Sequence, residues 1–221
     1  MKRAVLSALF LGLAGALAVV PASADTTIYS SGPGVNSTSN FDAWTISTPF
    51  QVTNSFTLFG NSNVTGATFD VWLDPGDAIS SVDWSFGNAA YGTSLGSGTA
   101  TLTPVFDELN GTGFDVYTAS FSGLDVLLTG GTYFFTLQNA VVTNGDQAFW
   151  DENDGSSTGY TNTNGSIGAY DCTNSFGCGL SGGETFTLLG STSPIPEPST
   201  ILLLGSGLAG LAGLLKRKIR A

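Results

Sequence analysis

The densest group of carboxylates in the chain lies in the segment Phe149–Gly155. Three carboxylates and one amide occupy four consecutive positions, Asp151, Glu152, Asn153 and Asp154. Calcium takes oxygen ligands of these kinds, so the four residues are a candidate Ca²⁺ site. Their spacing departs from the EF-hand pattern, because the glycine comes one residue early and no acidic residue closes the loop. A polar turn exposed to solvent is the alternative.

Three aromatic residues lie in or beside the same region, Trp150, Tyr160 and Tyr170. Sugar-binding faces combine stacking on aromatic rings with hydrogen bonds from acidic and amide side chains. The three residues are therefore candidate sugar-binding residues. Packing in a hydrophobic core is the alternative for each of them.

Carboxylates are also the main candidates for catalysis. The chain has no histidine, which removes the usual general base for a serine nucleophile. A pair of carboxylates can hydrolyse a glycoside, and Asp151, Glu152 and Glu184 are candidates for that reaction. Because any acidic domain offers carboxylates, the sequence favours a protein that is not an enzyme.

Cys172 and Cys178 are the only two cysteines. In an exported domain, such a close pair is typical of one disulfide that closes a small loop. A metal site would need more ligands, and no histidine supplies them. We therefore expect a disulfide between these two residues.

Alternating apolar and polar residues predict the strands that position these groups. The alternation is clearest at Phe56–Leu58, Phe69–Leu73, Val82–Phe86, Tyr133–Leu137 and Phe186–Leu188. Turn signals such as Asp74-Pro75-Gly76-Asp77 and Asn144-Gly145 punctuate them, and no helical period appears between residues 25 and 193. Many short strands at this length predict an all-β fold, an antiparallel two-sheet sandwich of jelly-roll-like style. The segment 151–183 is predicted to be the loosest part.

Charge is distributed unevenly along the chain. All 17 acidic residues lie between Asp25 and Glu197, whereas all 6 basic residues lie at the two ends. The interior therefore cannot form a salt bridge between side chains. Its negative charge disfavours contact with nucleic acid or anionic lipid.

The N-terminal segment has the pattern of a signal peptide. Lys2 and Arg3 precede the apolar run 4–20, and Ala22-Ser23-Ala24 supplies the small residues that a signal peptidase accepts. We expect cleavage after Ala24. Residues 1–24 are then a signal peptide and residues 25–193 the exported domain.

The C-terminal segment has the pattern of a membrane helix that follows a rigid, proline-rich stretch. Residues 199–215 are apolar or Gly, Ser and Thr, which is near the length of a membrane span. The basic residues after this segment are Lys216, Arg217, Lys218 and Arg220. The positive-inside rule places them in the cytoplasm and the preceding domain outside.

This tail resembles the PEP-CTERM sorting domain, which is sometimes labelled an ice-binding-protein C-terminal domain. Pro196, Glu197 and Pro198 form the motif, and the apolar segment and basic cluster follow it in order over residues 194–221. The resemblance implies recognition by an exosortase, a membrane-embedded transpeptidase-like enzyme, in a bacterium that makes exopolysaccharide. It implies that the tail is removed near the motif and the remainder passes to the cell surface or matrix.

Three functions remain open at this point. The first is a structural or adhesive surface or matrix protein; the second is a carbohydrate-binding module, assisted by calcium, that contacts exopolysaccharide. The third is a glycoside-active enzyme. Thr99, Thr101 and Thr103 alternate on one face, but a flat ice-binding surface needs a repeated ladder of this kind, and the sequence has no repeat.

Overall fold

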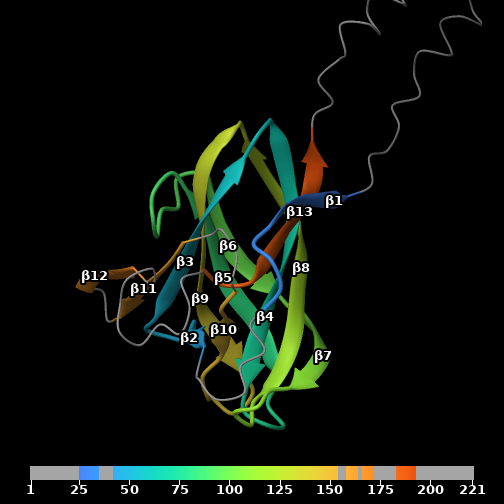
Figure 1. The fold of residues 1–221 in the computed structure, drawn as a ribbon, viewed down its shortest axis with the longest axis vertical. Coiled ribbons are helices and arrows are strands. Elements are labelled where there is room, and N and C mark those ends of the chain that lie inside the picture. Colours follow the sequence, from blue (N-terminus) through green and yellow to red (C-terminus); the bar gives the residue numbers. More distant parts are fainter. Residues whose placement is uncertain (1–24, 35–41, 154–157, 164–165, 172–182, 193–221) are drawn as a thin grey trace, which may run out of the picture.

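The computed structural model describes residues 25–34, 42–153, 158–163, 166–171 and 183–192. These residues form strands and connections and no helix, and the strands assemble into two antiparallel sheets (Figure 1). The predicted antiparallel two-sheet sandwich is therefore confirmed. The signal peptide, the C-terminal helix and both cysteines lie outside the described residues.

The first sheet is built around the long strand β4. It contains β1 (Thr26–Ser30), β2 (Ala43–Thr45), β4 (Ser62–Leu73), β7 (Thr103–Leu109), β8 (Asp115–Leu128), β10 (Phe149–Asp151) and β13 (Phe186–Thr192). One side of β4 pairs with β8, which in turn pairs with β7. Its other side is shared, because β13 pairs with the first part of β4 and β10 with the last.

The second sheet faces the first and has the order β12-β11-β3-β9-β5-β6. Its strands are β3 (Gln51–Leu58), β5 (Ile79–Gly87), β6 (Gly96–Thr101), β9 (Gly131–Val142), β11 (Gly159–Thr163) and β12 (Ser166–Asp171). β11 and β12 project to one side of the sandwich, and β7 lies at the opposite side (Figure 1). The region predicted to be loosest, residues 151–183, thus contributes two strands, β11 and β12, and the last residue of β10.

The hydrophobic core lies between the sheets and follows the predicted alternation. The alternating residues of the predicted strands are buried there, among them Phe56, Phe69, Phe86, Phe135 and Phe186. The rings of Phe56, Phe86, Phe135 and Phe186 contact one another, and those of Phe86 and Phe135 stack at 4.9 Å between centroids. These aromatic contacts join the two layers into one core.

A second, smaller cluster forms away from this core, around Trp72. The alternation places Trp72 on the opposite face of β4 from Phe69, yet Trp72 is also buried. Ala43 and Val116 are buried with it, and Phe114 and Phe149 pack against the group. Both faces of this end of β4 are therefore covered.

The two ends of the domain are paired with each other. Thr26 in β1 lies opposite Gly190 in β13, so the strands that begin and end the domain lie side by side (Figure 1). No helix in the described part of the chain has the length and apolar character needed to cross a membrane.

Candidate functional site

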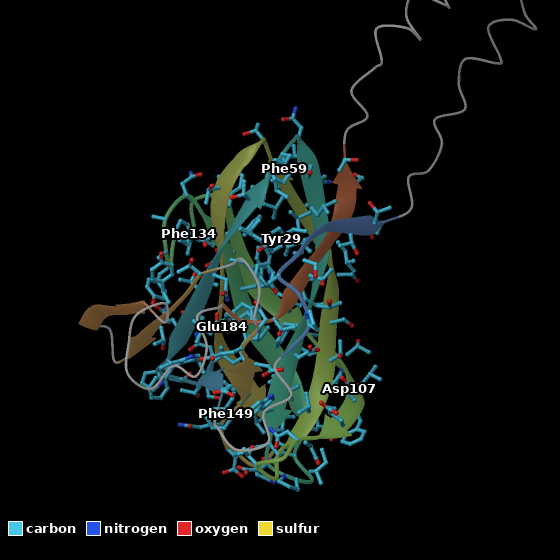
Figure 2. All side chains as sticks on the ribbon, in the orientation of Figure 1. Tyr29, Phe59, Asp107, Phe134, Phe149 and Glu184 are labelled. Carbon is cyan, nitrogen blue, oxygen red and sulfur yellow. The ribbon has the colours of Figure 1, made fainter. Side chains whose placement is uncertain are left out.

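Residues 151–153 run alongside residues 183–185 near the middle of the molecule. Thr185 N donates to the Asp151 carbonyl at 2.7 Å, and Asn153 N donates to the Gly183 carbonyl at 2.7 Å. Between these hydrogen bonds, Glu152 and Glu184 form an antiparallel bridge. Figure 2 shows Glu184 well away from the tip of the sandwich that Phe59 marks.

Four buried acidic residues surround this pairing, and we call them the buried carboxyl cluster: Asp42, Asp151, Glu152 and Glu184. Each has one buried carboxyl oxygen with no hydrogen-bond partner among the described residues. The other oxygen of Glu152 accepts a hydrogen bond from Trp44 Nε1 at 2.5 Å. The Glu152 amide donates to the Asp42 carbonyl at 3.0 Å. The backbone thus fixes the positions of carboxyls that each keep one buried oxygen without a donor among the described residues.

Burial raises the pKa values of three carboxyls in the cluster. The pKa of Asp151 rises to about 9, because burial disfavours the charged form and the charges of Asp70 and Glu152 add to that effect. Burial and the charge of Glu152 raise the pKa of Glu184 to about 8. Burial raises the pKa of Glu152 to about 7, although its hydrogen bond with Trp44 opposes the shift. Burial therefore favours the protonated forms of Asp151 and Glu184.

Two glycines let the backbone approach these carboxyls closely. A Cβ atom added to Gly159 in β11 would lie 2.5 Å from Glu184 Oε2, and one added to Gly34 would overlap Asp151 Oδ2. Glu184 Oε2 also belongs to the buried oxygens that have no donor. The backbone therefore covers the carboxyls so tightly that a side chain at either glycine would clash.

The structure separates the side chains of the residues that the sequence predicts to bind calcium. Asp151 and Glu152 are consecutive in extended backbone, so their side chains point to opposite faces. Asp151 contacts Trp72, whereas Glu152 contacts Trp44. Asn153 Nδ2 donates to the Glu184 carbonyl at 2.5 Å. These three residues are buried and do not form the exposed polar turn that the sequence left open; Asp154 lies outside the described residues.

The three carboxyl residues that are candidates for catalysis are buried as well. Glu184 is only 1% exposed, and Asp151 and Glu152 are buried as well. A glycosidase needs two carboxyls that flank a bound sugar. Of the three carboxyls, that of Asp151 belongs to a residue that lines a cavity of about 160 Å³ beside Asp70, Asp107 and Glu108.

Trp150 belongs to the core, which corrects its predicted place on a sugar-binding face. It is 0% exposed, its Nε1 donates to the Thr185 carbonyl at 2.7 Å, and its ring contacts those of Phe69, Phe135 and Phe186. A ring enclosed in this way has no face free to stack on a sugar.

The other two aromatic candidates lie in the strands that project from the sandwich. Tyr160 in β11 is half-buried, and its ring centroid lies 6.1 Å from that of Phe134. Tyr170 lies in β12 opposite Thr161. The structure thus separates both residues from the core position of Trp150.

An open groove, which the sequence did not predict as a site, runs along β6 and β8. It encloses about 510 Å³ and is lined by Trp84 together with five hydroxyl-bearing residues, and we call it the hydroxyl groove. The hydroxyl residues are Thr99, Thr101, Thr103, Ser120 and Ser122. The sequence signal for this groove is the alternation of Thr99, Thr101 and Thr103. Ser120 and Ser122 come from a distant segment, β8, so the sequence did not place them beside the threonines.

The packing of Trp84 against β6 gives the groove its floor. Trp84 is half-buried, and a Cβ atom added to Gly98 would lie 3.3 Å from its ring. The chain leaves β6 at Thr101 and enters β7 at Thr103, crossing between the two sheets there. Residues from both sheets therefore line one groove, whereas the Thr99 hydroxyl donates to Asp83 Oδ1 at 2.5 Å on the face of the sheet opposite Trp84.

The comparison with protein families concerns the C-terminal tail. Residues 194–218 match the model of the PEP-CTERM protein-sorting motif, as the resemblance of Pro196, Glu197 and Pro198 predicted. No curated protein matches the chain. The motif directs export and processing by an exosortase, with transient anchoring in the membrane beforehand.

Proposed function

We propose that this chain, an exported exosortase substrate that carries the PEP-CTERM sorting motif at residues 194–218, places an acidic β-sandwich at the cell surface or in the extracellular matrix. Its role there is structural or adhesive, and the proposal assigns it no catalysis. The observation that carries the proposal is the position of the motif relative to the last strand. β13 ends at Thr192, and the motif begins at residue 194.

Removal of the tail then leaves the fold intact. β13 is held within the first sheet by β1 on one side and β4 on the other. Cleavage near Pro196–Pro198 removes no residue of this strand, and cleavage after Ala24 removes none of β1, which begins at Thr26. Both processing points lie outside the strands, as a domain released in folded form requires.

The composition of the domain suits a hydrated matrix. All acidic residues except Glu197 lie in residues 25–193, which contain no lysine, arginine or histidine. Uncompensated negative charge keeps a protein soluble and repels it from anionic lipid. After release, no cationic patch holds the domain at the membrane surface.

Substitution of the sorting motif tests the proposal. We expect Pro196→Ala, Glu197→Ala and Pro198→Ala together to leave the full tail attached and the protein in the membrane fraction. The wild-type protein should appear at the surface or in the matrix with a mass that lacks residues 202–215. A surface-released wild-type product that retains those residues would contradict the proposal. Expression in a strain that lacks the exosortase is the matched control.

The hydroxyl groove supports a second candidate function, binding of exopolysaccharide. Sugars are bound by aromatic rings together with side chains that donate and accept hydrogen bonds. Trp84 provides the ring, and the hydroxyl-bearing residues Thr103, Ser120 and Ser122 line the groove beside it. The groove is open to solvent, unlike the buried carboxyl cluster.

Affinity electrophoresis in gels that contain the exopolysaccharide of the producing cells tests this second function. We expect retardation of the wild-type domain, and loss of retardation in Trp84→Leu, which removes the ring that lines the groove and keeps an apolar side chain. Trp84 is half-buried, so an unchanged circular dichroism spectrum verifies that the variant folds. Thr57→Ala with Thr132→Ala is the matched control, because these exposed threonines pair outside the groove. Equal retardation of all three proteins would exclude the groove as the binding site.

A further inference from the structure

Two loops at one end of the sandwich bring three carboxylates together. Asp74 and Asp77 belong to the β4–β5 connection and Asp146 to the β9–β10 connection. One carboxylate oxygen from each lies within 4.8 Å of the others. Among the described residues this is the one group of three or more such ligands, and it does not include the residues that the sequence predicted for calcium.

Backbone hydrogen bonds hold the two loops against each other. Thr143 N donates to the Ala78 carbonyl at 3.0 Å, and Ala78 N donates to Thr143 Oγ1 at 2.9 Å. Within the first loop, Asp77 N donates to the Asp74 carbonyl at 3.0 Å, and Gly76 has a φ of +90° that closes the turn. The approach of the three carboxylates is therefore set by the backbone.

Asp77 gives an independent sign that a ligand belongs among these residues. Its side chain is only 5% exposed, and one carboxylate oxygen accepts a hydrogen bond from Asn144 Nδ2. The other oxygen, Oδ2, is buried and has no hydrogen-bond partner among the described residues. A buried carboxylate oxygen without a partner is costly, because the protein does not replace the water that it loses.

Nothing in the exported domain can neutralise this group of charges from within. Residues 25–193 contain no lysine, arginine or histidine. Asp74 and Asp146 are exposed to solvent, so the group is open to an ion on one side and buried on the other, at Asp77. The chemistry that fits three carboxylates and open water positions is a hard cation with oxygen ligands.

We propose that Asp74, Asp77 and Asp146 form a calcium site that joins the β4–β5 and β9–β10 loops. Calcium takes six to eight oxygen ligands in flexible geometry, so water completes the coordination on the exposed side. Export exposes the site to extracellular calcium, and sites in extracellular modules have Kd values of about 10⁻⁴ to 10⁻³ M. The site is separate from the sorting tail and does not depend on the proposed function.

Calorimetric titration of the purified full chain in detergent with calcium chloride tests the site. We expect one calcium ion per chain, and binding at least about tenfold weaker in Asp74→Asn with Asp146→Asn. Both side chains are exposed, so the variant should fold, and an unchanged melting temperature in EDTA verifies this. Asp107→Asn with Asp125→Asn changes the charge equally at exposed positions elsewhere and should bind as the wild type does.

Several results would overturn the proposal. One is equal loss of binding in the two double variants, which would indicate general charge screening. Another is equal binding of magnesium, which demands near-octahedral geometry and gives up its water reluctantly. A third is loss of binding in Asp151→Asn with Glu152→Gln together with full binding in Asp74→Asn with Asp146→Asn, which would return the ion to the segment that the sequence predicted.

Discussion

Glu152 and Glu184 lie directly opposite each other in an antiparallel β-bridge, and both side chains are buried. Directly opposed residues of paired strands place their side chains on the same face, where two like charges destabilise the pairing. With no cationic side chain in residues 25–193, the pair is relieved by protonation. Burial is the main cause of the raised pKa of both groups, about 7 for Glu152 and about 8 for Glu184, and the charge of Glu152 adds to the shift of Glu184.

The first prediction is that the protein loses stability as the pH rises. A carboxyl whose pKa is higher in the folded state than in the unfolded state binds more protons when folded. Its contribution is complete below the unfolded value of 4.5 and is lost as the pH rises through about 7 for Glu152 and about 8 for Glu184. At about 1.4 kcal/mol per unit of pKa difference, the two groups together lower the free energy of unfolding by at most about 7 kcal/mol between pH 5 and pH 9. Urea unfolding at both pH values measures it.

A second prediction separates Glu184 from the other acidic residues. Glu184→Gln replaces the protonated carboxyl by a neutral group of similar shape, so stability at pH 5 should change little. Stability at pH 9 should rise relative to the wild type, because no buried charge forms there. Asp125→Asn is the matched control, because Asp125 is exposed and belongs to β8, outside the buried carboxyl cluster. A Glu184→Gln profile parallel to the wild-type profile would show that Glu184 does not titrate with folding.

The third prediction concerns the core position of Trp150. Removal of a large buried aromatic side chain costs about 3–5 kcal/mol, so Trp150→Ala should lower the free energy of unfolding by that amount. Tyr160→Ala removes a half-buried ring from β11 and should cost less. Urea titrations of both variants decide between a core role and a surface role. A small loss for Trp150→Ala would indicate that its ring is accessible after all.

The fourth prediction concerns Gly159. Gly159→Ala places a Cβ atom 2.5 Å from Glu184 Oε2, so either β11 or the Glu184 carboxyl must move. We expect a loss of stability of about 1–3 kcal/mol, as in other overpacked sites. The same change combined with Glu184→Ala should recover part of that loss, because the space is vacated. Equal, additive losses would mean that the two residues do not contact each other.

The fifth prediction concerns Cys172 and Cys178, which lie outside the described residues. Titration of the unreduced exported protein with a thiol reagent should find no free thiol. The loop between the cysteines is short, so the bond should contribute about 2 kcal/mol, near the low end for disulfides. Two reactive thiols per chain would contradict this prediction.

Local sequence determined the strands and the type of fold, because each depends on neighbouring residues. The alternation at Phe69–Leu73 and Tyr133–Leu137 predicts strands with one apolar face, and two such faces can be covered only by packing two sheets together. The sorting motif at 194–218 was likewise recognisable, since its order of proline, apolar segment and basic cluster is read along the chain. These features needed no information about distant contacts.

Only the tertiary structure decided which polar residues meet. Asp151 and Glu152 are adjacent in sequence, but extended backbone sends their side chains to opposite faces. Asp77 and Asp146 are distant in sequence, yet two loops bring their oxygens within 4.8 Å. The sequence predicted Trp150 as a candidate sugar-binding residue. Its side chain is 0% exposed, because the pairing of β10 with β4 places it between the sheets. Strand pairing joins segments far apart in the chain, so a local pattern of acids or aromatics does not reveal its neighbours or its exposure to solvent.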